Sequence, residues 1–176
     1  MRNFLFGLSL ALGPMLAAAQ SHPAAPATNS AAAAYVLPTA QLTLRAALAM
    51  AEQVRAKAAT LNKHVAVAVV DASGQTLLLI RDDGVGPHNT EAARRKAYTA
   101  LSTKTTTLLL SRSARTNPDT QNLNTLPELL LLSGGVPLHY RGQVIGGVGV
   151  AGGGSPENDD LLGHAAALLE AGITTP

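Results

Sequence analysis

The 176-residue sequence contains no cysteine and no tryptophan, and aromatic residues make up 3% of it. Without cysteine the chain forms no disulfide bonds and offers no thiolate ligand to a metal. Basic and acidic residues nearly balance, 13 against 11, and no basic run stands out. Because nucleic-acid binding depends on many phosphate contacts, this composition argues against a nucleic-acid partner.

The first 19 residues have the pattern of a signal peptide. Arg2 supplies a positive start, an apolar stretch runs from Phe4 to Leu16, and the small residues Ala17-Ala18-Ala19 precede a cleavage point before Gln20. The alternative is a retained membrane anchor, but the apolar stretch is shorter than the roughly 20 residues that a membrane span needs. We therefore expect a periplasmic or secreted protein that is not attached to the membrane after cleavage.

Two regions follow the predicted signal peptide. Residues 20–38 are rich in alanine, proline and serine and carry no periodic apolar face, which indicates a flexible lead. Residues 39–176 have the length of one ordinary domain that can bury a single core.

Hydrophobic periodicity predicts an α+β fold for this domain, in which hairpins make most of a central β-sheet antiparallel and helices pack on it. Thr43 is the expected N-cap of the first helix, and Asn89 or Thr90 that of the second. The expected elements in chain order are a helix over 43–61, strands over 64–71 and 75–81, a helix from 89 or 90 to about 101, a short helical piece over 108–112, a long loop over 113–127, a short strand over 129–132, strands over 136–140 and 143–151, and a helix over 159–171.

A glycine pattern, Gly147-x-Gly149-x-x-Gly152, matches a dinucleotide-binding fingerprint. Its context argues against that function, because the preceding strand belongs to a hairpin and too little chain follows for a βαβ unit. These glycines instead indicate a strand that another backbone or a ligand approaches closely.

Other candidate sites are weaker. Asp160 and His164 stand four apart on a predicted helix and could share an ion, but the favoured interpretation is that Asp160 serves the helix dipole and His164 is a surface or packing residue. Ser133 and His139 are close in sequence but lack the Gly-x-Ser-x-Gly turn of a hydrolase.

The most informative segment joins the second strand to the second helix. His88 follows the strand and precedes the helix, and Arg94, Arg95, Lys96 and Tyr98 come soon after. A neutral imidazole is a good iron ligand, and nearby cations pair with carboxylates such as haem propionates. The alternative for His88 is an ordinary surface or capping residue.

Four motifs stand in order along the predicted domain. They are Arg81-x-Asp83-Gly84, Ala92-Ala93-x-x-Lys96-Ala97-Tyr98, Gly134-Gly135-Val136-Pro137-Leu138 and Gly142-x-Val144-Ile145-Gly146-Gly147. Over residues 42–173 the sequence resembles the family of haem-binding proteins named after HbpS and GlcG. The resemblance implies a profilin-like α+β domain that assembles into homo-oligomers and binds haem or a related tetrapyrrole such as a corrinoid.

Within that resemblance we expect His88 to be an axial iron ligand, and Arg95 and Lys96 to neutralise propionates. Lys96 could equally pair with Asp83 and hold the loop. Tyr98 is added because of its proximity in the sequence.

The leading hypothesis is an exported, non-catalytic protein that stores, carries or senses haem. A second hypothesis is an oligomeric accessory module that binds another small molecule. The third is an enzyme that degrades haem or acts on small acids, for which the sequence shows no complete catalytic set.

Overall fold

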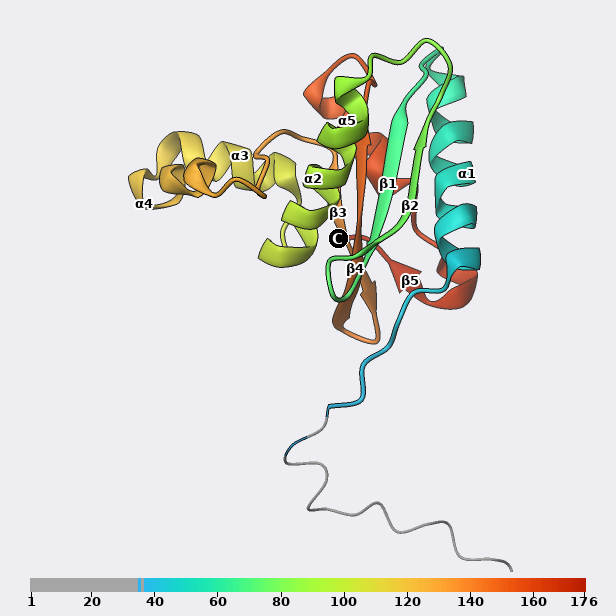
Figure 1. The fold of residues 1–176 in the computed structure, drawn as a ribbon, viewed down its shortest axis with the longest axis horizontal. Coiled ribbons are helices and arrows are strands. Elements are labelled where there is room, and N and C mark those ends of the chain that lie inside the picture. Colours follow the sequence, from blue (N-terminus) through green and yellow to red (C-terminus); the bar gives the residue numbers. More distant parts are fainter. Residues whose placement is uncertain (1–34, 36) are drawn as a thin grey trace, which may run out of the picture. The chain divides into compact units, whose positions relative to one another are not determined.

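The computed structural model describes Tyr35 and residues 37–176 (Figure 1). The predicted signal peptide and most of the predicted lead lie outside these residues. One compact unit spans Pro38–Pro176. Its elements are α1 (Leu44–Thr60), β1 (Ala66–Asp71), β2 (Thr76–Arg81), α2 (His88–Thr103), α3 (Thr107–Thr116), α4 (Pro118–Gln121), the 3₁₀ helix η2 (Asn122–Thr125), β3 (Gly135–Tyr140), β4 (Gln143–Ala151), α5 (Pro156–His164), η3 (Leu169–Ala171) and β5 (Ile173–Thr174).

The five strands form one antiparallel sheet in the order β2-β1-β4-β3-β5 (Figure 1). Both predicted hairpins are present, and β1 pairs with β4 between them from Ala66 opposite Ala151 to Asp71 opposite Gly146. The predicted α+β fold with a central antiparallel sheet is confirmed. Among the described residues, no helix has the length and apolar character needed to cross a membrane.

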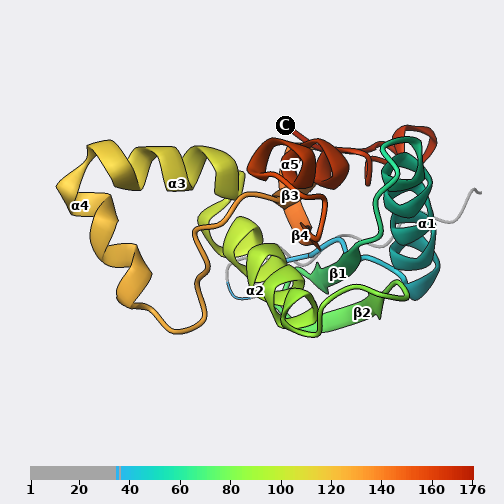
Figure 2. The ribbon, with the colours of Figure 1, turned by 90° about the horizontal axis from the view of Figure 1, so that it is seen from above.

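Helices α1 and α5 cover one face of the sheet, and α2 covers the other (Figure 2). The start of α1 is the predicted one, because the Thr43 hydroxyl accepts a hydrogen bond from the Ala46 amide at 3.1 Å. The core on this face is made of branched and long side chains, which fill the space between helix and strands. They include Met50, Val54, Val67, Val69, Val136, Leu138, Val148 and Leu162.

The α2 face is built from small residues, so the helix backbone lies close to the strands. A Cβ added to Gly149 would overlap the Ala93 carbonyl oxygen, and one added to Gly147 would overlap that of Ala97. Ala66 and Ala68 of β1 complete this face. The predicted close backbone approach at these glycines is confirmed, and α2 occupies the space that a bound dinucleotide would need.

An arm made of α3, α4 and η2 projects sideways from the sheet and its helices (Figure 2). The prediction of a long loop over 113–127 is wrong. Thr106 caps α3 by accepting from the Leu109 amide, and the helix continues to Thr116. Asn117 caps α4, whose first residue is Pro118. Proline is favoured at that position because its missing N–H has no helical partner to lose.

Three further elements differ from the predictions. Helix α2 begins at His88, because the chain is already helical at Pro87 and no side chain caps it. Residues 129–132 form no strand. The last helix begins at Pro156 with Ser155 as its cap and ends at His164. Gly172, with a φ of 69°, then turns the chain so that β5 pairs with β3.

Candidate functional site

The loop between β2 and α2 borders a surface hollow of about 290 Å³. The start of β1 and the end of β4 close its other sides. Most of its wall is polar or glycine, with one apolar side chain, Val85. The lining residues are His64, Asp83, Gly84, Val85, Gly86, Asn89 and Gly152. The hollow therefore offers polar groups to which a ligand can attach, and Val85 is the one apolar side chain in its wall.

Asp82 fixes the start of this loop. Its carboxylate accepts from Arg55 Nε at 2.7 Å and from the Val65 amide at 3.1 Å, and its own amide donates to the Val65 carbonyl at 3.0 Å. The hydrogen bond and charge of Asp82 raise the pKa of Arg55, so this cation is already paired. This role of Asp82 could not be predicted from the sequence, because nothing in the local pattern relates Asp82 to Arg55, which lies 27 residues earlier on α1.

His88 is the exposed first residue of α2. Its ring lies beside Gly86, where an added Cβ would be 2.9 Å from Cε1 and 3.1 Å from Nδ1. Neither ring nitrogen makes a hydrogen bond or ion pair within the part of the chain that the structure describes. A histidine in this state can present a lone pair to a metal without first breaking an internal contact.

Lys96 is placed differently from the prediction. Its side chain is buried, and Nζ donates to Asp159 Oδ2 at 2.7 Å and to the Val150 carbonyl at 2.8 Å. Asp159 also accepts from the Gly153 amide at 2.7 Å. Burial lowers the pKa of Lys96, and Asp159 partly offsets that effect. The suggested pair with Asp83 is therefore wrong: Lys96 pairs with Asp159, and its ammonium faces the interior.

Arg95 holds the end of the arm against α2. Its Nη2 donates to the Leu129 carbonyl at 2.6 Å, while Nε is buried and has no partner among the described residues. Next to it, Arg94 bonds Glu91 and Glu128, which raises the pKa of Arg94. These arginines belong to the joint between α2 and the arm rather than to the hollow beside the β2–α2 loop.

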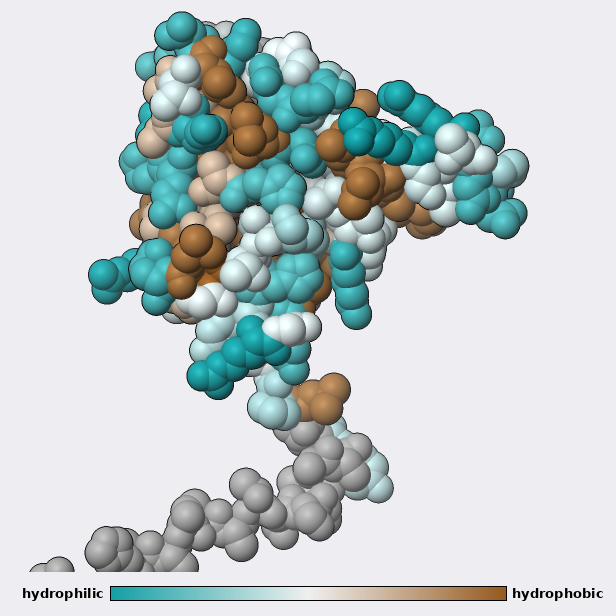
Figure 3. All heavy atoms as spheres, turned by 180° about the vertical axis from the view of Figure 1, so that it is seen from behind, coloured by the Kyte–Doolittle hydropathy of each residue, from teal (hydrophilic) through white to brown (hydrophobic). Residues whose placement is uncertain are grey.

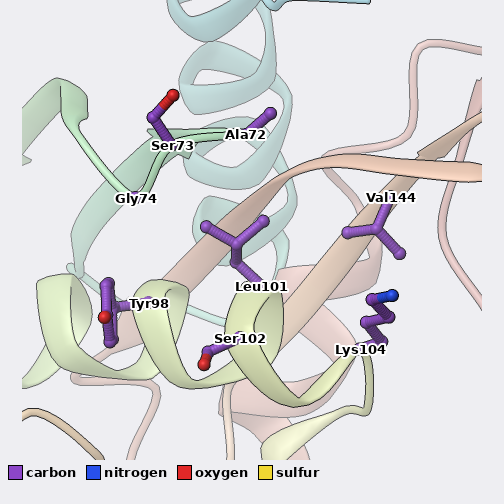
Figure 4. Close-up of a pocket in the computed structure, with 8 residues that line it drawn as sticks. All are labelled: Ala72, Ser73, Gly74, Tyr98, Leu101, Ser102, Lys104 and Val144. Carbon is purple, nitrogen blue, oxygen red and sulfur yellow. The ribbon is translucent and has the colours of Figure 1, made fainter. Parts of the chain in front are cut away.

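Tyr98 lines a separate hollow of about 280 Å³ near the other end of α2 (Figure 4). Tyr98 follows His88 by ten residues, which corresponds to about 15 Å along the helix axis. The structure thus brings His88 and Asp83 to one loop and leaves Tyr98 at a distance. The residues that line this second hollow are Ala72, Ser73, Gly74, Tyr98, Leu101, Ser102, Lys104 and Val144.

His64 is the residue of the first hollow that sequence reasoning missed. It precedes β1 in the sequence and has no motif around it. The β1–β2 hairpin brings it beside the β2–α2 loop, and the pairing of β1 with β4 brings it beside Gly152. The other weighed pair, His164 and Asp160, is 3.6 Å apart. Within residues 37–176 and Tyr35, no group of three or more His, Asp or Glu side chains is arranged to hold a metal ion.

The sequence model of a family described as haem degrading protein HbpS-like matches residues 42–168. The chain belongs to the HbpS-like family. An uncharacterised 15.0 kDa protein from the dhaT-dhaS intergenic region of Citrobacter freundii is 36% identical over 129 residues, which cover 72% of this chain and 90% of that relative.

Two crystal structures extend this HbpS-like relationship to the fold. The structure of HbpS is 37% identical, with a TM-score of 0.71, and the match covers 77% of this chain and 94% of HbpS. A PduOC:Heme complex is 27% identical, with a TM-score of 0.65, over 77% of this chain and 96% of PduOC. The described fold is therefore shared with a protein whose crystal structure contains haem.

Proposed function

We propose that this HbpS-like protein binds haem or a related tetrapyrrole, with His88 as an axial ligand of the iron. The observation that carries the proposal is membership of the family together with the similarity to a haem complex over almost all of PduOC. The exposed imidazole of His88, with no internal partner in the described residues, supports the choice of ligand.

The residues beside the β2–α2 loop fit such a ligand in their donor chemistry. Bound haem would supply an iron that accepts imidazole nitrogen, and propionates that require cations. His88 and His64 offer the nitrogen. Lys63 offers the cation that Lys96 does not. It lines a neighbouring hollow that shares His64 with the first one, and its Nζ lies 3.0 Å from where a Cβ of Gly154 would stand. Asp83 would repel a propionate and is better suited to hold the loop or a partner cation.

Hemin titration tests this proposal directly. Hemin is added to the mature protein, beginning at Gln20, and the Soret band is recorded together with the affinity. We expect a shifted band for the wild-type protein, a loss of the shift in His88→Ala, and a smaller change in His64→Ala. His139→Ala and His164→Ala serve as matched controls, because both residues lie away from the hollow.

Two results would overturn parts of the proposal. If the wild-type protein leaves the hemin spectrum unchanged, haem binding is wrong, and the second hypothesis of an accessory module for another small molecule takes its place. If all four histidine variants bind as tightly as wild type with the same spectrum, haem binding stands and the assignment of His88 is wrong.

We propose that binding occurs without turnover. The test is incubation of the hemin complex with ascorbate and identification of the products by mass spectrometry. An open-chain tetrapyrrole that forms with wild type and not with His88→Ala would overturn it. Bleaching without such a product is the expected result, because free haem is also bleached by reductant and oxygen.

Export is proposed from residues 1–19 alone. Their charged start, apolar stretch and small residues support cleavage after Ala19. Expression of the full chain with fractionation, followed by intact mass measurement, tests it. The expected product is extracytoplasmic and begins at Gln20, and an uncleaved chain in the cytoplasm contradicts it.

A homo-oligomer is proposed with the arm as a contact surface for a second copy. Leu109 of α3 and Leu126, directly after η2, are each at least half exposed, and hydrophobic surface lies where the arm leaves the body (Figure 3). Exposed apolar surface of this kind is typical of a subunit contact. Light scattering after size exclusion should give a mass above that of one chain, and Leu109→Asp/Leu126→Asp should reduce it to that of one chain.

A further inference from the structure

A further, smaller hollow of about 100 Å³ lies between α3, the segment that leads into β3, and the start of α5. It is separate from the hollow that His64 and the β2–α2 loop line, and it shares no lining residue with it. Its wall combines hydroxyl, guanidinium and leucine side chains. The lining residues are Leu108, Ser111, Arg112, Arg115, Leu131, Leu132, Ser133, Pro156 and Glu157.

Two buried hydroxyl groups line this hollow without a protein partner. Ser111 is 9% exposed and Ser133 is 6% exposed. Neither hydroxyl makes a hydrogen bond within the part of the chain that the structure describes. Neither seryl oxygen is among the side-chain atoms of the described residues that are fully buried and unpaired, which are Arg95 Nε and Asp160 Oδ1. Both hydroxyls therefore keep accessible surface and are free to bond a molecule in the hollow that their residues line.

The charges around the hollow favour an anion. Arg112 and Arg115 bring two guanidinium groups from α3, and the nine-residue helix α5 begins at its rim. The carboxylate of Glu157 opposes them from the rim, at 3.8 Å from Arg112 Nη2, and the charge of Arg112 also acts on the nearby Asp160. The side chains of Arg112 and Glu157 are more than half exposed, so their contact is weak and easily replaced.

Leucine side chains form the rest of the wall, with Leu108 from α3 and Leu131 and Leu132 from the segment before β3. We propose that this hollow binds an organic carboxylate with a short apolar body. The carboxylate takes the place that Glu157 now has beside Arg112 and accepts from the hydroxyls of Ser111 and Ser133. The apolar body contacts the leucines, which a fully hydrated inorganic anion would not use.

The test is a titration of ¹⁵N-labelled, haem-free protein with hexanoate, followed by amide chemical shifts. We expect shifts that saturate at the amides of Ser111, Ser133 and Glu157. Arg112→Gln/Arg115→Gln should weaken binding about tenfold, because charge-assisted hydrogen bonds are lost. Glu157→Gln should strengthen it about threefold, because a competing surface carboxylate is removed. Arg45→Gln, an exposed arginine change on α1, is the matched control.

Hexanamide and inorganic phosphate separate the chemical classes. Hexanamide should leave these amides unchanged, and phosphate should bind at least tenfold more weakly than hexanoate, since it gains no apolar contact. The proposal is wrong if hexanoate shifts none of these amides, or if the double arginine variant binds it as tightly as the Arg45→Gln control. Equal binding of phosphate and hexanoate overturns the assignment to an organic carboxylate.

Discussion

The ammonium group of Lys96 and the carboxylate of Asp159 meet at 2.7 Å in the interior and join α2 to α5 across the end of β4. The Val150 carbonyl completes the contacts of Lys96, and the Gly153 amide binds the other oxygen of Asp159. Gly134 leaves room for this cluster, because a Cβ there would be 2.8 Å from the Cβ of Asp159. A buried ion pair of this kind fixes the relative position of the two helices.

Removing one member of this pair should destabilise the protein strongly. We expect Lys96→Met to lower the free energy of unfolding by about 3–5 kcal/mol, because it leaves Asp159 charged, buried and without its cation. Urea denaturation measures this effect. Glu52→Gln, which breaks an exposed contact with Arg55 at 3.5 Å, is the control and should change stability by less than about 1 kcal/mol. Equal effects of the two substitutions would contradict the structural role of the buried pair.

Asp160 should make stability depend on pH in the acid range. Burial raises its pKa above the ordinary 3.8, while His164 and Arg112 act in the opposite direction. A carboxyl group with a raised folded pKa binds its proton more tightly in the folded state, so its contribution is lost as pH rises from 3.8 through the folded value.

Asp160→Asn should therefore be more stable than wild type at neutral pH, and the difference should disappear below pH 3.8. Unfolding curves at a series of pH values measure it, with the exposed Asp119→Asn as the control. A wild-type protein that is more stable than Asp160→Asn at neutral pH would show that the charge of Asp160 is stabilising.

Gly149 should tolerate no side chain at all. In Gly149→Ala the new methyl group meets the Ala93 carbonyl oxygen, and neither backbone can move without separating α2 from the sheet. We expect a loss of at least about 3 kcal/mol in the free energy of unfolding. Gly142→Ala provides the comparison: its φ of 77° costs about 1–2 kcal/mol, and nothing lies within 4 Å of the added Cβ. Equal costs at the two positions would show that close packing is not the reason for Gly149.

Gly86 offers a way to move His88 without removing it. In Gly86→Ala the new methyl group lies 2.9 Å from the His88 ring, which is free to rotate away. We expect hemin affinity to fall about tenfold, as for other residues that orient a ligand, with an unchanged unfolding midpoint. Adding Gly86→Ala to His88→Ala should have no further effect. A further loss in that double variant would mean that Gly86 acts on binding independently of His88.

The strands and the first helix could be predicted because their signals are local. Alternating valines define β1, and spaced alanines and leucines with Thr43 as cap define α1. The helices of the arm could not be predicted, because Asn117-Pro118 is typical of a turn and fits the start of a helix equally well. The partner of Lys96 could not be predicted for a different reason. Asp159 is 63 residues away in the sequence, and only the order of the strands in the sheet brings the start of α5 close to Lys96.

The candidate site beside the β2–α2 loop could also be predicted only where its residues are close in the sequence. His88 and Asp83 lie in one loop, so their proximity follows from the sequence. Tyr98 has the same apparent proximity, but a rigid helix carries it about 15 Å away. The predicted hairpin places His64 opposite the loop that contains Asp83, but its position beside Gly152 depends on the pairing of β1 with β4, which the sequence does not reveal.

The two faces of the sheet set different limits on how this sequence can vary through evolution. Beneath α1, a loss of volume at Val54 can be offset by a gain at Val67 or Val69 of β1, because α1 packs on this strand and bulky side chains fill the space between them. Beneath α2 there is no volume to exchange, since Gly147 and Gly149 meet the helix backbone itself. We therefore expect relatives to differ by paired, compensating changes on the face beneath α1. On the face beneath α2 we expect the small residues to be kept, with sequence differences confined to the exposed side of α2.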